Sequence, residues 1–229
     1  MGLQGYGPLL LSGARITVSL ALVSLLMALL LGMAGALAKT SGVRVVSSAA
    51  RAYTTLVRGI PDLVLVLLLF YSLQQGLNSV TEHWGFARLE IDPFAAASLT
   101  LAVIYGAYFT EVFRGAFIAV PAGQMEAARS YGLSPAQAFV RILFPQMLRF
   151  ALPGIANTWQ VLLKSTGLIS VVGLIDMVAV AQQAGKATNQ YFLFTAVVGA
   201  GFLLLGTGSS LLLKWLDIKY SAGCRRGQF

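Results

Sequence analysis

The sequence has almost none of the residues that build metal sites and covalent cross-links. Its 229 residues include one cysteine, Cys224, and one histidine, His83. A lone cysteine excludes an internal disulfide and a cysteine metal site. Serines and threonines occur, but none has a base at a recognisable catalytic spacing, and the phosphate-binding pattern G-x-x-x-x-G-K-[ST] is missing from the sequence. We therefore expect that this chain is not an enzyme and does not itself hydrolyse ATP. We also expect it to bind neither a cofactor nor a metal.

Charged residues are also scarce, at 10% of the chain against 57% hydrophobic residues. The chain contains apolar runs longer than about 18 residues, the length that indicates a membrane-spanning helix. A net charge of +8 is compatible with nucleic-acid binding, but the basic residues cluster beside apolar runs and are not interleaved with aromatic ones. The composition predicts an integral membrane protein that does not bind nucleic acid.

Five apolar stretches are expected to form transmembrane helices, which gives an all-α fold. The predicted spans are 16–38, 61–80, 93–120, 153–175 and 191–213, within a single transmembrane domain covering residues 1–229. Gly32 and Gly35 allow close helix approach near the end of the first span. Five spans without an internal repeat favour half of a pore that must dimerise. The alternative is a self-sufficient secondary carrier or channel for a small cationic solute.

The distribution of basic residues predicts the orientation of these spans. Eleven of the sixteen lysines and arginines flank one set of helix ends, namely residues 39–58, the polar stretch after residue 120 and the tail. The opposite flanks hold three, Arg15, Arg88 and Lys186. Because cytoplasmic loops are enriched in basic residues, the amino terminus is expected in the periplasm and the carboxy terminus in the cytoplasm.

A polar stretch between the third and fourth spans, residues 121–145, is expected to form a cytoplasmic helical hairpin. Glu126 lies near the start of its first helix, where the helix dipole favours an acid. Gly132 ends that helix, because glycine takes the left-handed conformation without strain. Ser134 and Gln137 then match a capping box, which predicts the start of a second helix.

This hairpin resembles a known family motif. The pattern is Glu-Ala-Ala, three residues, glycine, nine residues, isoleucine, one residue and Phe-Pro, formed here by Glu126, Ala127, Ala128, Gly132, Ile142, Phe144 and Pro145. It resembles the coupling motif of ABC importer permeases, in which the helix fits a groove on the cytoplasmic ATPase; Phe144 stands where leucine is usual. The second helix is expected to end before Pro145. The alternative is an amphipathic helix pair on the membrane surface with no partner.

Ionisable residues in the third span need a partner or a function, because each costs about 2.5 to 3.5 kcal/mol to insert. Glu111 and Arg114 are three residues apart and can pair on one helix face. Alternatively, Glu111 and Tyr108 line a translocation pathway for a cationic solute. The run from Tyr108 to Gly115 resembles the Tyr-x-x-Glu-x-x-Arg-Gly signature of polar amino-acid permeases.

The second and fourth spans carry further polar candidates. Asn157, Gln160 and Lys164 fall on one helix face, either as pore lining or as polar contacts between helices. Their segment is similar to the corresponding part of the same permease family. Asp62 follows Pro61 at a helix start, where a capping role is favoured over contact with a solute.

The resemblance extends over nearly the whole chain and is greatest to the Q-type permease subunits of histidine and lysine/arginine/ornithine importers. The pairs Pro61-Asp62, Trp159-Gln160 and Phe144-Pro145 carry this finer assignment. It implies the type I ABC importer permease fold, in the lipid of the bacterial inner membrane. It also implies transport of polar, basic amino acids such as histidine, arginine, lysine and ornithine. The implied partners are a second permease subunit (a similar chain or itself), two cytoplasmic ATPase subunits and a periplasmic amino-acid-binding protein.

Overall fold

The computed structural model describes residues 5–84 and 90–220, with side chains up to residue 215. Cys224 and Arg88 lie outside the described residues. Regular structure within them is entirely helical, which confirms the predicted all-α fold. The elements are α1 (Gly7–Thr40), α2 (Arg44–Gly59), α3 (Asp62–His83), α4 (Pro93–Ala119), α5 (Ala122–Ser130), α6 (Pro135–Ala138), the π-helical η1 (Phe139–Leu143), α7 (Phe144–Ser165), the 3-10 helix η2 (Thr166–Val172), α8 (Met177–Thr188) and α9 (Tyr191–Tyr220).

Five helical stretches are long and apolar enough to cross a membrane, as predicted. They are Gly7–Thr40, Asp62–His83, Pro93–Ala119, Pro135–Val172 and Tyr191–Trp215. The first begins at Gly7, well before the predicted residue 16. Pro8 occupies the first turn of α1, where its missing N–H costs nothing, and Arg15 is exposed, so neither residue interrupts the helix.

The expectation that the second helix of the hairpin ends before Pro145 is wrong. The chain stays helical from α6 through η1 into α7, and the fourth span therefore begins well before residue 153. In η1 the amide of Phe144 donates to the carbonyl of Phe139, five residues back. This wider turn changes the hydrogen-bonding register just before Pro145, which then lies in the first turn of α7. Pro153 likewise lies inside α7, as proline can in membrane helices.

The helix α4 is the centre of the fold. Tyr105 and Phe109 on it are fully buried. The helix α1 packs along α4 where Gly32 faces Phe109 and Gly35 faces Thr110, and a Cβ added at either glycine would overlap those side chains. The predicted close approach at Gly32 and Gly35 is therefore confirmed. Because lipid tails are as apolar as these side chains, this pair is stabilised by close van der Waals packing.

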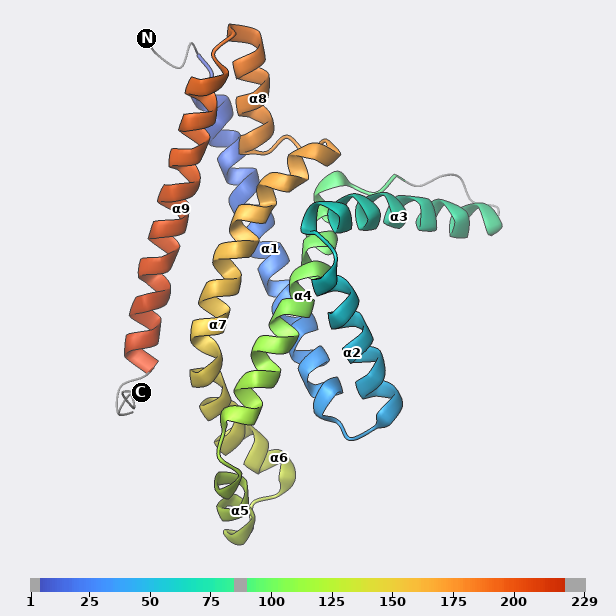
Figure 1. The fold of residues 1–229 in the computed structure, drawn as a ribbon, viewed down its shortest axis with the longest axis vertical. Helices are drawn as coiled ribbons and strands as arrows, with labels where there is room; N and C mark the ends of the chain where they lie inside the picture. The colour runs from blue at the N-terminus through green and yellow to red at the C-terminus, as the bar shows by residue number, and fades with distance from the viewer. Residues whose placement is uncertain (1–4, 85–89, 221–229) are drawn as a thin grey trace.

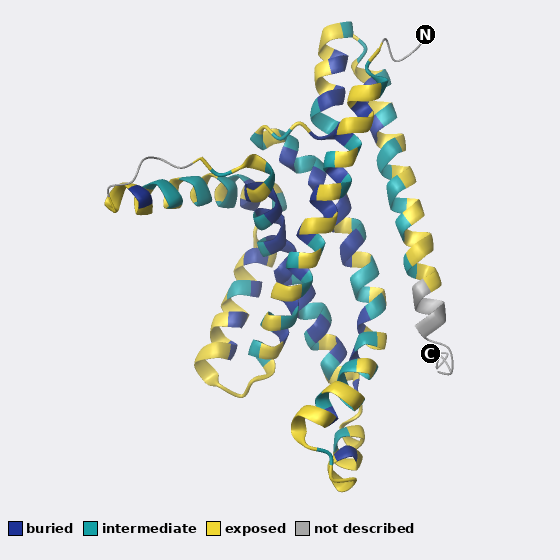
Figure 2. Cartoon of the chain, turned by 180° about the vertical axis from the view of Figure 1, so that it is seen from behind, coloured by how far each residue is buried: buried dark blue, intermediate teal, exposed yellow. Residues whose placement is uncertain are grey.

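The remaining helices are arranged around α1 and α4 (Figure 1). The helices α1, α4, α7 and α9 run along the long axis of the molecule, whereas α3 turns away across it after Pro61. The hairpin formed by α5 and α6 lies at one end, near the end of α9, and α8 lies with the start of α1 at the other. Buried residues gather where α1, α4 and α7 meet, while the hairpin is largely exposed (Figure 2). The hairpin and the amino terminus thus lie at opposite ends of the molecule, and the orientation of these ends across the membrane stays a prediction.

Candidate coupling hairpin and transport pathway

The turn of the hairpin follows the local sequence rules. Gly132 has a φ of +73°, the left-handed conformation that ends α5. Ser134 and Gln137 form the predicted capping box: the Ser134 amide donates to Gln137 Oε1 at 3.0 Å, and the Gln137 amide donates to Ser134 Oγ at 3.3 Å. Every hydrogen bond here is local, so the shape of the turn is set by its own residues.

The motif residues divide into an anchored and an exposed set. Ala128 is buried against the rest of the hairpin, whereas Glu126, Ala127, Gly132 and Pro145 are exposed and Ile142 is half-buried. The ring of Phe139 lies 6.2 Å from those of both Phe117 and Phe144. These aromatic contacts join the hairpin to the end of α4. Phe144, where the family usually has leucine, thus adds a ring contact to this junction.

Glu111 is held by two cations. Arg114 Nε donates to Glu111 Oε2 at 2.9 Å, which confirms the predicted pairing on one face of α4. Lys39, in the last turn of α1, forms a second ion pair with Glu111 Oε1 and also donates to Thr54 Oγ1 at 2.5 Å. The Lys39 side chain is only 7% exposed. Both carboxylate oxygens of Glu111 are therefore already neutralised within this chain.

Asp62 lies in the first turn of α3, where the helix dipole favours its negative charge as predicted, but its side chain forms no capping hydrogen bond. Its carboxylate faces α4, where the hydroxyl of Tyr105 donates to it at 2.9 Å and that of Tyr108 at 3.5 Å. Tyr105 is also hydrogen-bonded to Ser165 Oγ at 2.5 Å. The chain bends at Pro61, and this bend turns Asp62 toward the tyrosines. Contact of Asp62 with a solute stays a prediction.

Tyr108 contacts both the carboxylate of Asp62 and a cation, the guanidinium of Arg58. Its ring stacks on that of Tyr105, with centroids 5.5 Å apart, and the guanidinium of Arg58 lies 5.4 Å from its centroid. Asp62, Tyr105, Tyr108 and Arg58 therefore form one cluster contributed by α2, α3 and α4, which we call the Asp62 cluster. No sequence pattern indicates Tyr105 and Arg58 as members of this cluster, because only the packing of three helices brings them to Asp62 and Tyr108.

The α7 candidates face α9, away from the Asp62 cluster. Gln160 Nε2 lies within hydrogen-bonding distance of Gly206 O, Ser209 Oγ and Ser210 Oγ, at 3.1, 3.0 and 2.9 Å, so both of its N–H groups have acceptors on α9. Asn157 and Lys164 are exposed, and each lines a hollow between α7 and α9 together with Gln160. The structure thus brings Asn157, Gln160 and Lys164 together, as their spacing predicts, and does not join them to Glu111 or Asp62.

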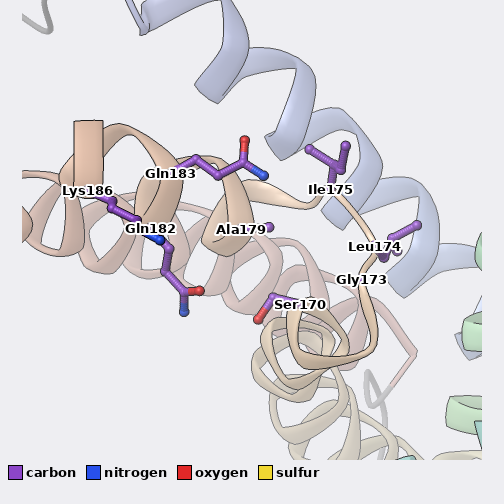
Figure 3. Close-up of a pocket in the computed structure, with 8 residues that line it drawn as sticks. All are labelled: Ser170, Gly173, Leu174, Ile175, Ala179, Gln182, Gln183 and Lys186. Atoms are coloured by element: carbon purple, nitrogen blue, oxygen red, sulfur yellow. The ribbon is translucent and has the colours of Figure 1, made fainter. Parts of the chain in front are cut away.

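A further hollow of about 260 Å³, which the sequence did not indicate, lies between η2 and α8 at the end opposite the hairpin. Figure 3 shows Gln182, Gln183 and Lys186 of α8 on one side, with Ser170 and the turn from Gly173 to Ile175 on the other. Asp176 follows this turn and caps α8, accepting from the Ala179 amide at 2.8 Å. Burial raises the pKa of the Asp176 carboxyl to about 6. Its Oδ2 has no hydrogen-bond partner among the described residues.

Apolar spanning helices, an exposed helical hairpin at one end and charged groups within the spans define a membrane transport subunit. Among the described residues, no three His, Cys, Asp or Glu side chains are grouped to hold a metal ion. Residues 24–221 match the family described as binding-protein-dependent transport system inner membrane component, and the chain belongs to that family.

Relatives within the family agree with this assignment. The chain is 50% identical over 224 residues to the histidine/lysine/arginine/ornithine transport system permease protein HisQ of Escherichia coli K12, covering 98% of both chains. It is 33% identical over 230 residues to the arginine ABC transporter permease protein ArtQ of the same organism, covering 95% of this chain and 97% of ArtQ.

A solved structure, an amino acid ABC transporter with histidines, matches with a TM-score of 0.78 and 30% identity, covering 93% of this chain and 95% of the other. These findings confirm the predicted fold and family. The chain is an inner-membrane permease of the amino-acid ABC importer type, a kind of system that also contains an ATPase and a binding protein. Family membership favours this function over a self-sufficient carrier or channel.

Proposed function

We propose that this permease imports basic amino acids such as histidine, arginine, lysine and ornithine. The names of HisQ and ArtQ support this substrate class. The observation that carries the proposal is the Asp62 cluster. The carboxylate of Asp62 accepts hydrogen bonds from tyrosine hydroxyls and forms no ion pair with the described cations, so it retains a charge that a cationic solute can use. A cation crossing a low-dielectric region needs such a carboxylate in place of its lost hydration.

The other predicted pathway residues have different roles in the proposed transport of a cation. Tyr108 forms the aromatic wall beside Asp62. Glu111 and Arg114 lie one turn further along α4 as a neutralised pair, which makes them poorer ligands for a cation. Asn157, Gln160 and Lys164 line the path only if the α9 face meets the second permease subunit.

The remaining partners follow from the exposed hairpin. We propose that Glu126, Ala127, Ala128, Gly132, Ile142 and Pro145 form the surface that docks on an ATPase. The complex would contain a second permease subunit, two ATPase subunits that hydrolyse ATP, and a periplasmic amino-acid-binding protein. The basic flanks and the separation of the two ends support a periplasmic amino terminus with the hairpin in the cytoplasm.

Uptake by the complete transporter in proteoliposomes tests the substrate assignment. Asp62→Asn keeps the shape and a hydrogen-bond acceptor but removes the charge, and we expect arginine uptake to fall at least tenfold. Histidine at pH 8, where its side chain is neutral, should be affected less. The matched control is Asp92→Asn, an exposed cap of α4 that accepts from the Ala95 amide at 2.9 Å. Normal arginine uptake by Asp62→Asn at equal abundance would overturn the proposal.

A further inference from the structure

A second charged cluster lies between α1, α2 and α4, and the proposed transport function does not use it. A hollow of about 310 Å³ is lined by Lys39, Arg51, Glu111 and Arg114. The three basic side chains surround a single carboxylate, so the lining carries a formal charge of +2. Because like charges in a confined site repel one another, this arrangement favours an additional anion.

The site has hydrogen-bond donors to offer as well as charge. Each guanidinium has five N–H donors. Within the described chain, Arg51 uses donors on Ser47, with Nε to Ser47 O at 3.2 Å and Nη2 to Ser47 Oγ at 2.8 Å. Arg114 uses Nε on Glu111. These bonds fix the position of both guanidinium groups and leave donors that match the paired oxygens of a phosphate.

The depth of the hollow matches a lipid headgroup. Arg114 lies 21 residues after Pro93, the first residue of α4. At about 1.5 Å per residue this is about 32 Å along the helix, close to the hydrocarbon thickness of about 30 Å. Lys39 in the last turn of α1 reaches the same level. If α4 begins at one face of the membrane, the hollow lies at the opposite interface, on the side of the coupling hairpin.

We propose that Lys39, Arg51 and Arg114 bind the phosphate group of an anionic phospholipid of the cytoplasmic leaflet. Basic pockets between transmembrane helices on this side of a membrane suit anionic headgroups. Glu111 holds Lys39 and Arg114 in place, and Arg51 on the exposed face of α2 completes the site from the lipid side. The bound lipid would hold α2, the helix that leads to the bend at Pro61, against α1 and α4.

The test uses the purified transporter complex in neutral detergent, titrated with dioctanoyl phosphatidylglycerol while its thermal unfolding midpoint is recorded. Dioctanoyl phosphatidylcholine and inorganic phosphate are the comparison ligands. We expect phosphatidylglycerol alone to raise the midpoint. Arg51→Gln should weaken its apparent affinity about fivefold, the factor for one basic residue near an anionic surface. Arg44→Gln, an exposed arginine on the same helix that does not line the hollow, is the control and should bind normally.

Three results would overturn the proposal. Equal stabilisation by inorganic phosphate would assign the site to a free anion. Equal weakening by Arg51→Gln and Arg44→Gln would show attraction to the basic surface in general. No response to phosphatidylglycerol in the unaltered complex would mean that the hollow is covered in the assembly.

Discussion

Lys39 at the end of α1 forms an ion pair with Glu111 on α4, 72 residues later in the chain. This contact gives Glu111 a structural role between two helices. Paired only with Arg114, the acid would be one half of a local pair on a single helix. With Lys39 as well, it joins the two helices that form the centre of the fold. The acid that remains without a cationic partner near the centre of the described structure is Asp62.

Breaking this contact should therefore affect assembly of the subunit more than its selectivity. Lys39→Met leaves Glu111 with Arg114, while Glu111→Gln leaves the buried Lys39 ammonium without its carboxylate and should be the more harmful change. The double variant Lys39→Met/Glu111→Gln should recover abundance, with a coupling energy of about 1 to 2 kcal/mol. Thermal unfolding of the four proteins measures it. Additive effects of the two changes would contradict a direct pair, and the pair Arg114→Gln with Glu111→Gln is the control because it still leaves Lys39 unpaired.

The hairpin variants should lose the ATPase while keeping the membrane subunit intact. Glu126 is exposed on α5, so Glu126→Lys changes the docking surface and no buried contact. We expect co-purification of the ATPase to fall at least tenfold at unchanged membrane abundance. Glu90→Lys makes the same charge change at an exposed acid far from the hairpin and should retain the ATPase. If Glu126→Lys binds the ATPase as well as Glu90→Lys does, the hairpin is not the docking surface.

The hairpin was predictable because its determinants are local. Gly132, Ser134 and Gln137 act over three or four residues, and the turn does not depend on what the rest of the chain does. The contacts of Asp62 are different in kind. Tyr105 lies 43 residues away, and only the bend at Pro61 and the packing of α3 on α4 bring the two together. The sequence named Asp62 and Glu111 and paired Glu111 with Arg114 on the same helix, but it could not supply their partners from other helices, Tyr105 and Lys39.

Pro145 shows another limit of sequence reasoning. A proline ordinarily marks a helix boundary, since it lacks an N–H and its ring meets the preceding turn. The π-helical turn at η1 removes that conflict by shifting the hydrogen bonds to residues five apart. The sequence of η1 does not predict this π-helical turn. A hairpin helix that continues into α7 provides a stiff connection from the docking surface to the membrane span.

Cysteine labelling tests the orientation. In a Cys224→Ser background, Asn189→Cys lies in the exposed turn between α8 and α9, and Gly132→Cys lies at the tip of the hairpin. An impermeant maleimide added to intact cells after outer-membrane permeabilisation should label the Asn189 position and not the Gly132 position. Labelling of both after inner-membrane disruption shows that each thiol is reactive. The reverse pattern would contradict the periplasmic amino terminus.

The raised pKa of Asp176 predicts that the stability of the folded protein depends on pH. Its pKa of about 6 in the folded protein exceeds the ordinary value of 3.8 because the carboxyl is buried. The folded protein therefore binds more protons than the unfolded chain between about pH 4 and 6, and this group lowers the free energy of unfolding as the pH rises through that window. The full effect is about 3 kcal/mol and stays constant above the window.

Asp176→Asn keeps the cap on α8 and should remove this part of the dependence. The unfolding midpoint of the variant should change less between pH 4 and 7 than that of the unaltered complex, and should be higher at pH 7. Asp92→Asn, at the exposed cap of α4, is the control and should keep the original profile. A variant with an unchanged profile would show that Asp176 keeps its ordinary pKa in the assembled transporter.

Gln160 separates a structural role from a pathway role on the α9 face. Its amide nitrogen has two N–H groups and three acceptors within reach on α9, and interhelical hydrogen bonds in membranes contribute on average about 0.6 kcal/mol each. If these bonds hold α9 to α7, Gln160→Ala should lower the thermal unfolding midpoint and reduce uptake of arginine and histidine to the same extent. If the side chain lines the pathway, the midpoint should stay close to normal while the uptake of the two solutes changes unequally. Asn157→Ala, one turn earlier on the same face and exposed, is the matched control. We expect the first pattern for Gln160, because its donors are already engaged and a passing solute would have to break those bonds to use them.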